Sequence, residues 1–118
     1  FNGMPRGVNE HLTYRTHAPY KYWFFEHAER NAIYNAARSG QRISGATMFV
    51  LELPCADCAR AIIQSGIKEL VTACLEIPRK SGNDPCDWRN SVGEGVDMLQ
   101  EAEVRIRLCG SENEAFLQ

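Results

Sequence analysis

The sequence lacks any apolar run that could cross a membrane as a helix. Its longest apolar stretch, residues 46–51, has the length of a strand, whereas a membrane-spanning helix needs about 20 residues. The first seven residues also lack the basic region and apolar run of a secretory leader. We therefore expect a soluble protein in the cytoplasm, without a membrane partner.

A strong charge of either sign is missing too. The chain has 13 Lys and Arg against 15 Asp and Glu, a formal net charge of −2. Residues 1–45 hold six basic and three acidic side chains, a small excess that suits a single phosphate group rather than a long polyanion. We therefore expect a small-molecule partner and no nucleic-acid partner.

The number of cysteines is odd, so they cannot all pair in disulfides within the chain. There are five, at positions 55, 58, 74, 86 and 109, which argues against a secreted disulfide scaffold and favours metal ligands or free thiols. The 118 residues are 44% hydrophobic and 24% charged, close to the globular average. This length and composition predict one domain over residues 1–118 with a core that needs no disulfides.

Helical and strand patterns alternate along the chain after a long loop over residues 1–20. We predict helices at 27–39, 55–65 and 88–103, strands at 46–53, 69–74 and 104–108, and a loop at 77–87. Gly93 and Gly95 should each weaken the last helix by about 1 kcal/mol relative to Ala. The alternation predicts crossover units, and hence an α/β layered domain with parallel pairing among the later strands.

Metal-binding side chains occur at two of the predicted helix starts. Cys55 and Cys58 form a C-x-x-C pair, and His27 is followed by Glu29. Zn²⁺ accepts such a Cys/Cys/His set, and the positive end of a helix favours the thiolates that bind it. With three protein ligands the fourth position can hold water, which suggests catalysis with Glu29 as a proton carrier. Taken alone, the C-x-x-C pair also fits a structural zinc or a redox pair.

The two motifs together match the H-x-E…P-C-x-x-C signature of zinc deaminases. Further segments resemble the deoxycytidylate (dCMP) deaminase branch of the cytidine deaminase superfamily. They are FNGMPRG at 1–7, KY at 21–22, HAERNAI at 27–33, GATMFV at 45–50 and PCADCARAIIQSGIKELV at 54–71. The resemblance implies a three-layer α/β/α cytidine deaminase-like fold with a mixed, mostly parallel sheet.

The resemblance also implies an activity and a role for each site residue. The reaction is zinc-dependent hydrolysis of dCMP to dUMP and ammonia, in which water attacks C4 of the pyrimidine. His27, Cys55 and Cys58 would hold the zinc. Glu29 would protonate N3 and then the leaving amine. The backbone N–H of Ala28 would bind the pyrimidine O2, and Asn2 would contact the sugar-phosphate.

The resemblance further implies a homo-oligomer, commonly a hexamer, with dCTP or dTTP as effectors. In the family a helix and a hairpin precede the N-G-x-P loop, whereas this sequence opens at Phe1. We therefore expect that N-terminal elements are missing from it. His11 and His17 fit loop residues, with a second metal site as the alternative.

Three other functions stay open. The chain could deaminate another free cytosine nucleoside, nucleotide or base, or act on tRNA, although a nucleic-acid deaminase usually has a more basic surface. It could also be a non-catalytic module in which zinc only supports the fold. A structural zinc would take a fourth protein side chain, whereas a catalytic zinc keeps an open position.

Overall fold

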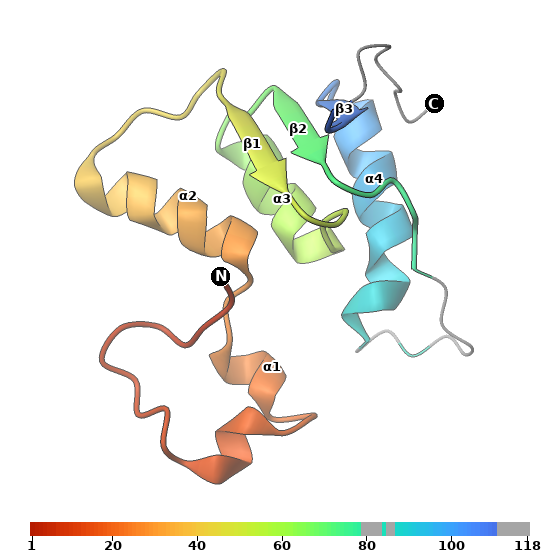
Figure 1. Cartoon of the computed structure of the whole chain (residues 1–118). Coiled ribbons are helices and arrows are strands. Elements are labelled where there is room, and N and C mark those ends of the chain that lie inside the picture. Colours follow the sequence, from red (N-terminus) through yellow and green to blue (C-terminus); the bar gives the residue numbers. More distant parts are fainter. Residues whose placement is uncertain (79–83, 85–86, 111–118) are drawn as a thin grey trace.

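The computed structural model of the chain describes residues 1–78, 84 and 87–110. Cys86 and part of the predicted loop 77–87 lie outside this range. The elements in chain order are η1 (Thr13–Thr16), α1 (Lys21–Phe24), α2 (Ala28–Ser39), β1 (Thr47–Val50), α3 (Ala56–Gln64), β2 (Glu69–Thr72), η2 (Trp88–Ser91), α4 (Val92–Glu101) and β3 (Arg105–Leu108). The predicted alternation of helices and strands is therefore confirmed (Figure 1).

The three strands form a parallel sheet in the order β1-β2-β3. In its register, Phe49 and Arg107 lie on either side of Val71. The predicted parallel pairing among the later strands is confirmed. Within the described residues the remaining bridge is an isolated antiparallel one between Gly3 and Glu26.

The core lies between the sheet and the helices α3 and α4. Figure 1 shows α3 behind β1 and β2, with α4 beside it. Ile62 of α3, Leu99 of α4 and Leu70 of β2 are fully buried in one hydrophobic cluster. On the opposite face Phe49 of the edge strand β1 is 70% exposed, whereas its register partner Val71 of the central strand β2 is buried. Helix α3 of this layer carries Cys58 and has Cys55 at its N-cap, two of the residues that the sequence assigns to the metal.

Several element boundaries differ from the sequence prediction, and β2, for example, ends at Thr72 rather than at residue 74. Strand β1 ends at Val50, not at residue 53, because its partner β2 offers only the four residues Glu69–Thr72 for pairing. The predicted helix over 88–103 begins as the short 3-10 turn η2 and becomes α-helical from Val92. The predicted loop over residues 1–20 holds one short 3-10 turn, η1.

Helix α2 lies at the surface, and none of its residues is fully buried. It ends at Gly40, which has φ of 71°, a left-handed conformation that glycine adopts at little cost. In the described part of the chain, no helix has both the length and the apolar composition to cross a membrane.

Candidate metal centre

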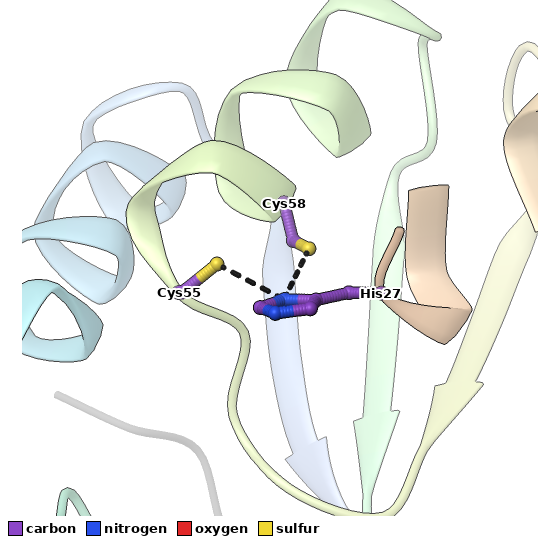
Figure 2. A group of neighbouring side chains, drawn as sticks. All are labelled: His27, Cys55 and Cys58. Carbon is purple, nitrogen blue, oxygen red and sulfur yellow. Dashed lines mark hydrogen bonds between the residues drawn. The ribbon is translucent and has the colours of Figure 1, made fainter. Parts of the chain in front are cut away.

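The three predicted metal ligands come together at the N-termini of α2 and α3. His27 is the N-cap residue of α2 and Cys55 is the N-cap residue of α3, with Cys58 in the first turn of α3. Figure 2 shows the imidazole of His27 facing both sulfur atoms. Both helices therefore direct the positive ends of their dipoles at one point, which favours thiolates there.

The distances between the ligand atoms fit a zinc ion. His27 Nδ1 lies 3.4 Å from Cys55 Sγ and 3.4 Å from Cys58 Sγ. Zinc bonds of about 2.0 Å to nitrogen and 2.3 Å to sulfur in a tetrahedron place N and S about 3.5 Å apart. All three ligand atoms lie within 4.8 Å of one another, and both cysteines are buried. The donor set and its spacing thus fit Zn²⁺.

Hydrogen bonding shifts the pKa values of the two cysteines in opposite directions. The hydrogen bond from Cys58 is the largest cause that lowers the pKa of Cys55, to about 4, and His27 adds to it. The same hydrogen bond, together with burial, raises the pKa of Cys58. Hydrogen bonding to Cys55 also raises the pKa of His27. The surroundings of Cys55 therefore favour its thiolate, the form that binds metal.

Glu29 lies beside this group in an open pocket. Its Oε2 is 3.9 Å from Cys58 Sγ, and the residue is only partly buried. The pocket has a volume of about 570 Å³ and is lined by Glu29, His27 and Trp88, among other residues. That volume accommodates a small organic ligand. The carboxylate can thus exchange protons with a molecule in the pocket.

Asn2 and Ala28 also line the pocket, and they contact each other. The Ala28 N–H donates to Asn2 Oδ1 over 2.7 Å. Both residues predicted to bind substrate therefore lie at the start of α2. The donor that the resemblance assigns to the pyrimidine O2 is paired with the Asn2 side chain in this structure.

Side chains from distant segments cap both ligand-bearing helices. His27 and Cys55 make no capping bonds to their own helices, because their side chains face each other. Asn2 instead accepts from the first N–H of α2, and Ser91 Oγ accepts from Ala56 N–H of α3 over 3.0 Å. Each helix start thus keeps a satisfied N–H while its N-cap side chain is turned toward the metal site.

Arg30 links the two ligand segments. Its Nε lies 3.0 Å from Glu26 Oε1 and its Nη1 lies 3.4 Å from Asp57 Oδ2, with 16% of the side chain exposed. Burial opposes its charge, but Cys58 and Glu26 outweigh this and raise the pKa of Arg30. The guanidinium therefore joins Glu26, which precedes His27, to Asp57, which precedes Cys58.

The sequence prediction missed three residues that support the site, namely Arg30, Ser91 and Asn31. Asn31 Nδ2 donates to the carbonyl oxygen of Phe1 over 3.1 Å. The spacing of Arg30, three residues after His27, was an available signal for a neighbour on the same helix face. The partners of Ser91 and Asn31 are 35 and 30 residues away in sequence, so no local pattern indicates them.

The other candidate ligands do not join the site. Among residues 1–78, 84 and 87–110, the His27 group is the one set of three or more His, Cys, Asp or Glu that could hold a metal. His11 and His17 belong to no such set in this part of the chain. Cys74 and Cys109 are free thiols.

Comparison with known proteins supports the assignment. Residues 2–74 match the family model described as the cytidine and deoxycytidylate deaminase zinc-binding region. A deoxycytidylate deaminase of Enterobacteria phage T4 is 67% identical over 87 residues, 74% of this chain and 43% of the relative. A deoxycytidylate deaminase of Mus musculus is 40% identical over 76 residues, 60% of this chain and 42% of the relative.

A solved structure of a dCMP deaminase has a similar fold. The dCMP deaminase from the cyanophage S-TIM5, in complex with dCMP and dUMP, superposes with a TM-score of 0.62 at 28% identity. The match covers 91% of this chain and 68% of that one. The expected α/β cytidine deaminase fold is confirmed.

The chain spans less than half the length of the T4 and mouse relatives. With a matching family model over residues 2–74 and a His/Cys/Cys group placed to hold zinc, the chain belongs to the cytidine and deoxycytidylate deaminase family.

Proposed function

We propose that the protein catalyses the zinc-dependent hydrolysis of dCMP to dUMP and ammonia. The observation that supports this most is the Glu29 carboxylate beside the His27, Cys55 and Cys58 group, in a pocket open to a ligand. Within the described residues that group has no fourth His, Cys, Asp or Glu, which favours a catalytic over a structural zinc. The relatives named deoxycytidylate deaminase support dCMP as the substrate.

In this mechanism the residues of the chain hold the metal and move protons. His27 Nδ1 and the two sulfur atoms bind the zinc, which when bound supplies a Lewis acid that makes water a nucleophile near pH 7. Glu29 takes a proton from the attacking water and delivers it to N3 of the pyrimidine. It then takes the proton of the hydroxyl formed at C4 and delivers it to the amine at C4. The C4–N bond breaks, a C4=O bond forms, and ammonia leaves.

Asn2 and Ala28 position the nucleotide. The N–H of Ala28 is the donor for the pyrimidine O2, so the nucleotide shares this donor with Asn2 Oδ1. Asn2 lies at the edge of the same pocket, within reach of the sugar-phosphate part of a ligand. Arg30 keeps the two ligand segments together without entering the lining of the pocket.

A substrate panel tests this proposal. The zinc-loaded chain is incubated with dCMP, deoxycytidine or dCTP, and ammonia release is measured. We expect release from dCMP at the highest kcat/KM. Turnover of deoxycytidine without turnover of dCMP would instead favour the alternative, a deaminase of another free cytosine compound.

A tRNA deaminase remains the second alternative. Saturable binding of tRNA in a gel shift at physiological salt would support it, whereas the net charge of −2 argues for no shift.

We place the reaction in the cytoplasm, because Cys55 and Cys58 must stay reduced to bind metal and that compartment preserves thiols.

The proposed assembly is a homo-oligomer, a hexamer by resemblance, with dCTP and dTTP as effectors. Phe49 is 70% and Leu51 81% exposed, but both line the candidate pocket, so the proposed assembly rests on the resemblance. Light scattering after gel filtration measures the mass, and the mass of a single chain at micromolar concentration would contradict this assembly. A rate unchanged by dCTP and dTTP would contradict their role as effectors.

A further inference from the structure

Residues 1–3 form a strip that is hydrogen-bonded along the start of α2. Gly3 and Glu26 exchange two backbone bonds, of 3.1 and 2.8 Å. Ala28 N–H donates to Asn2 Oδ1 over 2.7 Å, and Asn31 Nδ2 donates to the Phe1 carbonyl over 3.1 Å. The strip is thus held on both sides of Asn2, by the Gly3 bridge after it and by Asn31 before it.

The bond to Ala28 also decides how the Asn2 amide is turned. A backbone N–H can only donate, so the Asn2 atom that faces it must be the oxygen. The NH2 group of Asn2 is therefore not used in the bond to α2. Since Asn2 lines the pocket, this group is the one available to donate to an acceptor on a bound nucleotide.

Asn31 fixes this arrangement without touching the pocket. It lies one turn after His27, whose carbonyl accepts the Asn31 backbone N–H over 3.0 Å. It does not line the pocket, whereas both Phe1 and Asn2 do. Its side-chain bond therefore reaches from the helix that carries a metal ligand to the wall of the pocket.

We propose that Asn31 is a positioning residue, which anchors the Phe1 carbonyl so that Asn2 is held against Ala28 with its NH2 group presented to the nucleotide. This inference rests on the proposed function for its effect on nucleotide affinity. Its structural part, the anchoring of residues 1–3, does not depend on any activity. Asn31 acts through Asn2, so the two residues should not contribute independently.

A double-mutant cycle tests the proposal on the full zinc-loaded chain, with dUMP as the ligand and calorimetry as the measurement. Asn31→Ala should weaken dUMP binding by about fivefold, as expected for the loss of one neutral hydrogen bond. The same change made on top of Asn2→Ala should have no further effect. Asn31→Asp retains the shape but lacks the donor, and should weaken binding as Asn31→Ala does.

Asn35 provides a matched control on the same helix. Its Oδ1 accepts from Arg6 Nη2 over 2.7 Å, so it too ties the N-terminal segment to α2, but neither residue lines the pocket. Asn35→Ala should leave dUMP affinity unchanged. Equal losses in Asn31→Ala and Asn35→Ala, or additive effects of Asn31→Ala and Asn2→Ala, would overturn the proposal.

Amide hydrogen exchange separates this inference from the proposed function. Asn31→Ala should speed exchange of the Ala28 amide by a similar factor of about five, with the zinc content unchanged. If the unchanged chain binds zinc but not dUMP, the proposed function fails. The exchange rate of the Ala28 amide then still shows whether Asn31 anchors residues 1–3. An Ala28 amide whose exchange is the same in both proteins would overturn the inference.

Discussion

His27 and Cys55 occupy the N-cap positions of two helices, yet each directs its side chain at the other rather than at its own helix. An N-cap residue usually accepts a hydrogen bond from the first turn, so a ligand in that position leaves an N–H without its usual partner. Asn2 and Ser91 supply the missing acceptors from elsewhere in the chain. Metal binding and helix capping are thus divided between different residues.

Ser91 gives the first prediction at this scale. Ser91→Ala removes the acceptor of the Ala56 N–H, next to Cys55, and should lower the free energy of unfolding by about 1 kcal/mol. Zinc affinity should fall as well, because Cys55 is then held less firmly. Urea unfolding and competition with a chromophoric chelator measure the two effects.

Ser65 is the control for that substitution. Its hydroxyl donates to the Ile62 carbonyl at the far end of α3, remote from the ligands. Ser65→Ala should therefore leave zinc affinity unchanged. Equal zinc affinities in Ser91→Ala and the unchanged chain would show that the cap does not support the metal site.

Glu29 gives the second prediction. Glu29→Gln keeps the size of the side chain but removes its ability to carry protons, so dCMP turnover should fall by about 100- to 10,000-fold. The three ligands do not change, so zinc content measured by atomic absorption should stay at that of the unchanged protein. A near-normal rate in Glu29→Gln would show that another group moves the proton.

At the scale of the element, α4 supports the metal site through a glycine. A Cβ at Gly95 would lie 3.0 Å from the Pro54 carbonyl oxygen and 3.1 Å from that of Cys55. From sequence, Gly95 counts only as a weakness in a helix. In the structure it allows α4 to pack against the backbone that carries a metal ligand.

The two glycines of α4 should therefore respond differently to alanine. Gly95→Ala forces backbone atoms apart and should lower the free energy of unfolding by about 1 to 3 kcal/mol, together with zinc affinity. Gly93 has open space around its Cβ position, so Gly93→Ala should raise stability by up to about 1 kcal/mol. Urea unfolding of both variants checks this, and a Gly95→Ala protein as stable as Gly93→Ala would contradict the close packing.

The order of helices and strands could be predicted because it follows from local patterns. Residues 28–39 show helical spacing, and the run before Pro54 has the composition of a strand. The end of β1 could not be predicted, because it depends on how many residues β2 offers for pairing. The metal ligands were predictable from their motif, whereas Asn31 and Ser91 were not, because their bonds join distant parts of the chain.

At the scale of the whole molecule, the metal site joins helix α2 to helix α3 of the core, and the Arg30–Asp57 pair and the packing of Ile33 against the core join them as well. Helix α2 has no fully buried residue, while α3 belongs to the buried core. A zinc ion bound by His27 on one side and by two cysteines on the other would therefore hold α2 against the core. Folding and metal binding should be linked.

Removal of zinc gives the prediction at this scale. A ligand that binds only the folded state at 100 times its dissociation constant stabilises that state by about 2.7 kcal/mol. Treatment with EDTA should therefore lower the melting temperature, and added zinc should restore it. Cys58→Ser should abolish the response, whereas Cys109→Ser, at an exposed free thiol, should retain it.

The coordination of the bound zinc shows directly whether His27, Cys55 and Cys58 leave one position open. X-ray absorption of the zinc-loaded chain should show two sulfur atoms at about 2.3 Å, and one nitrogen and one oxygen at about 2.0 to 2.1 Å. That result would leave one position for water beside Glu29. A shell filled by four protein side chains, or one with fewer than two sulfur atoms, would contradict the account.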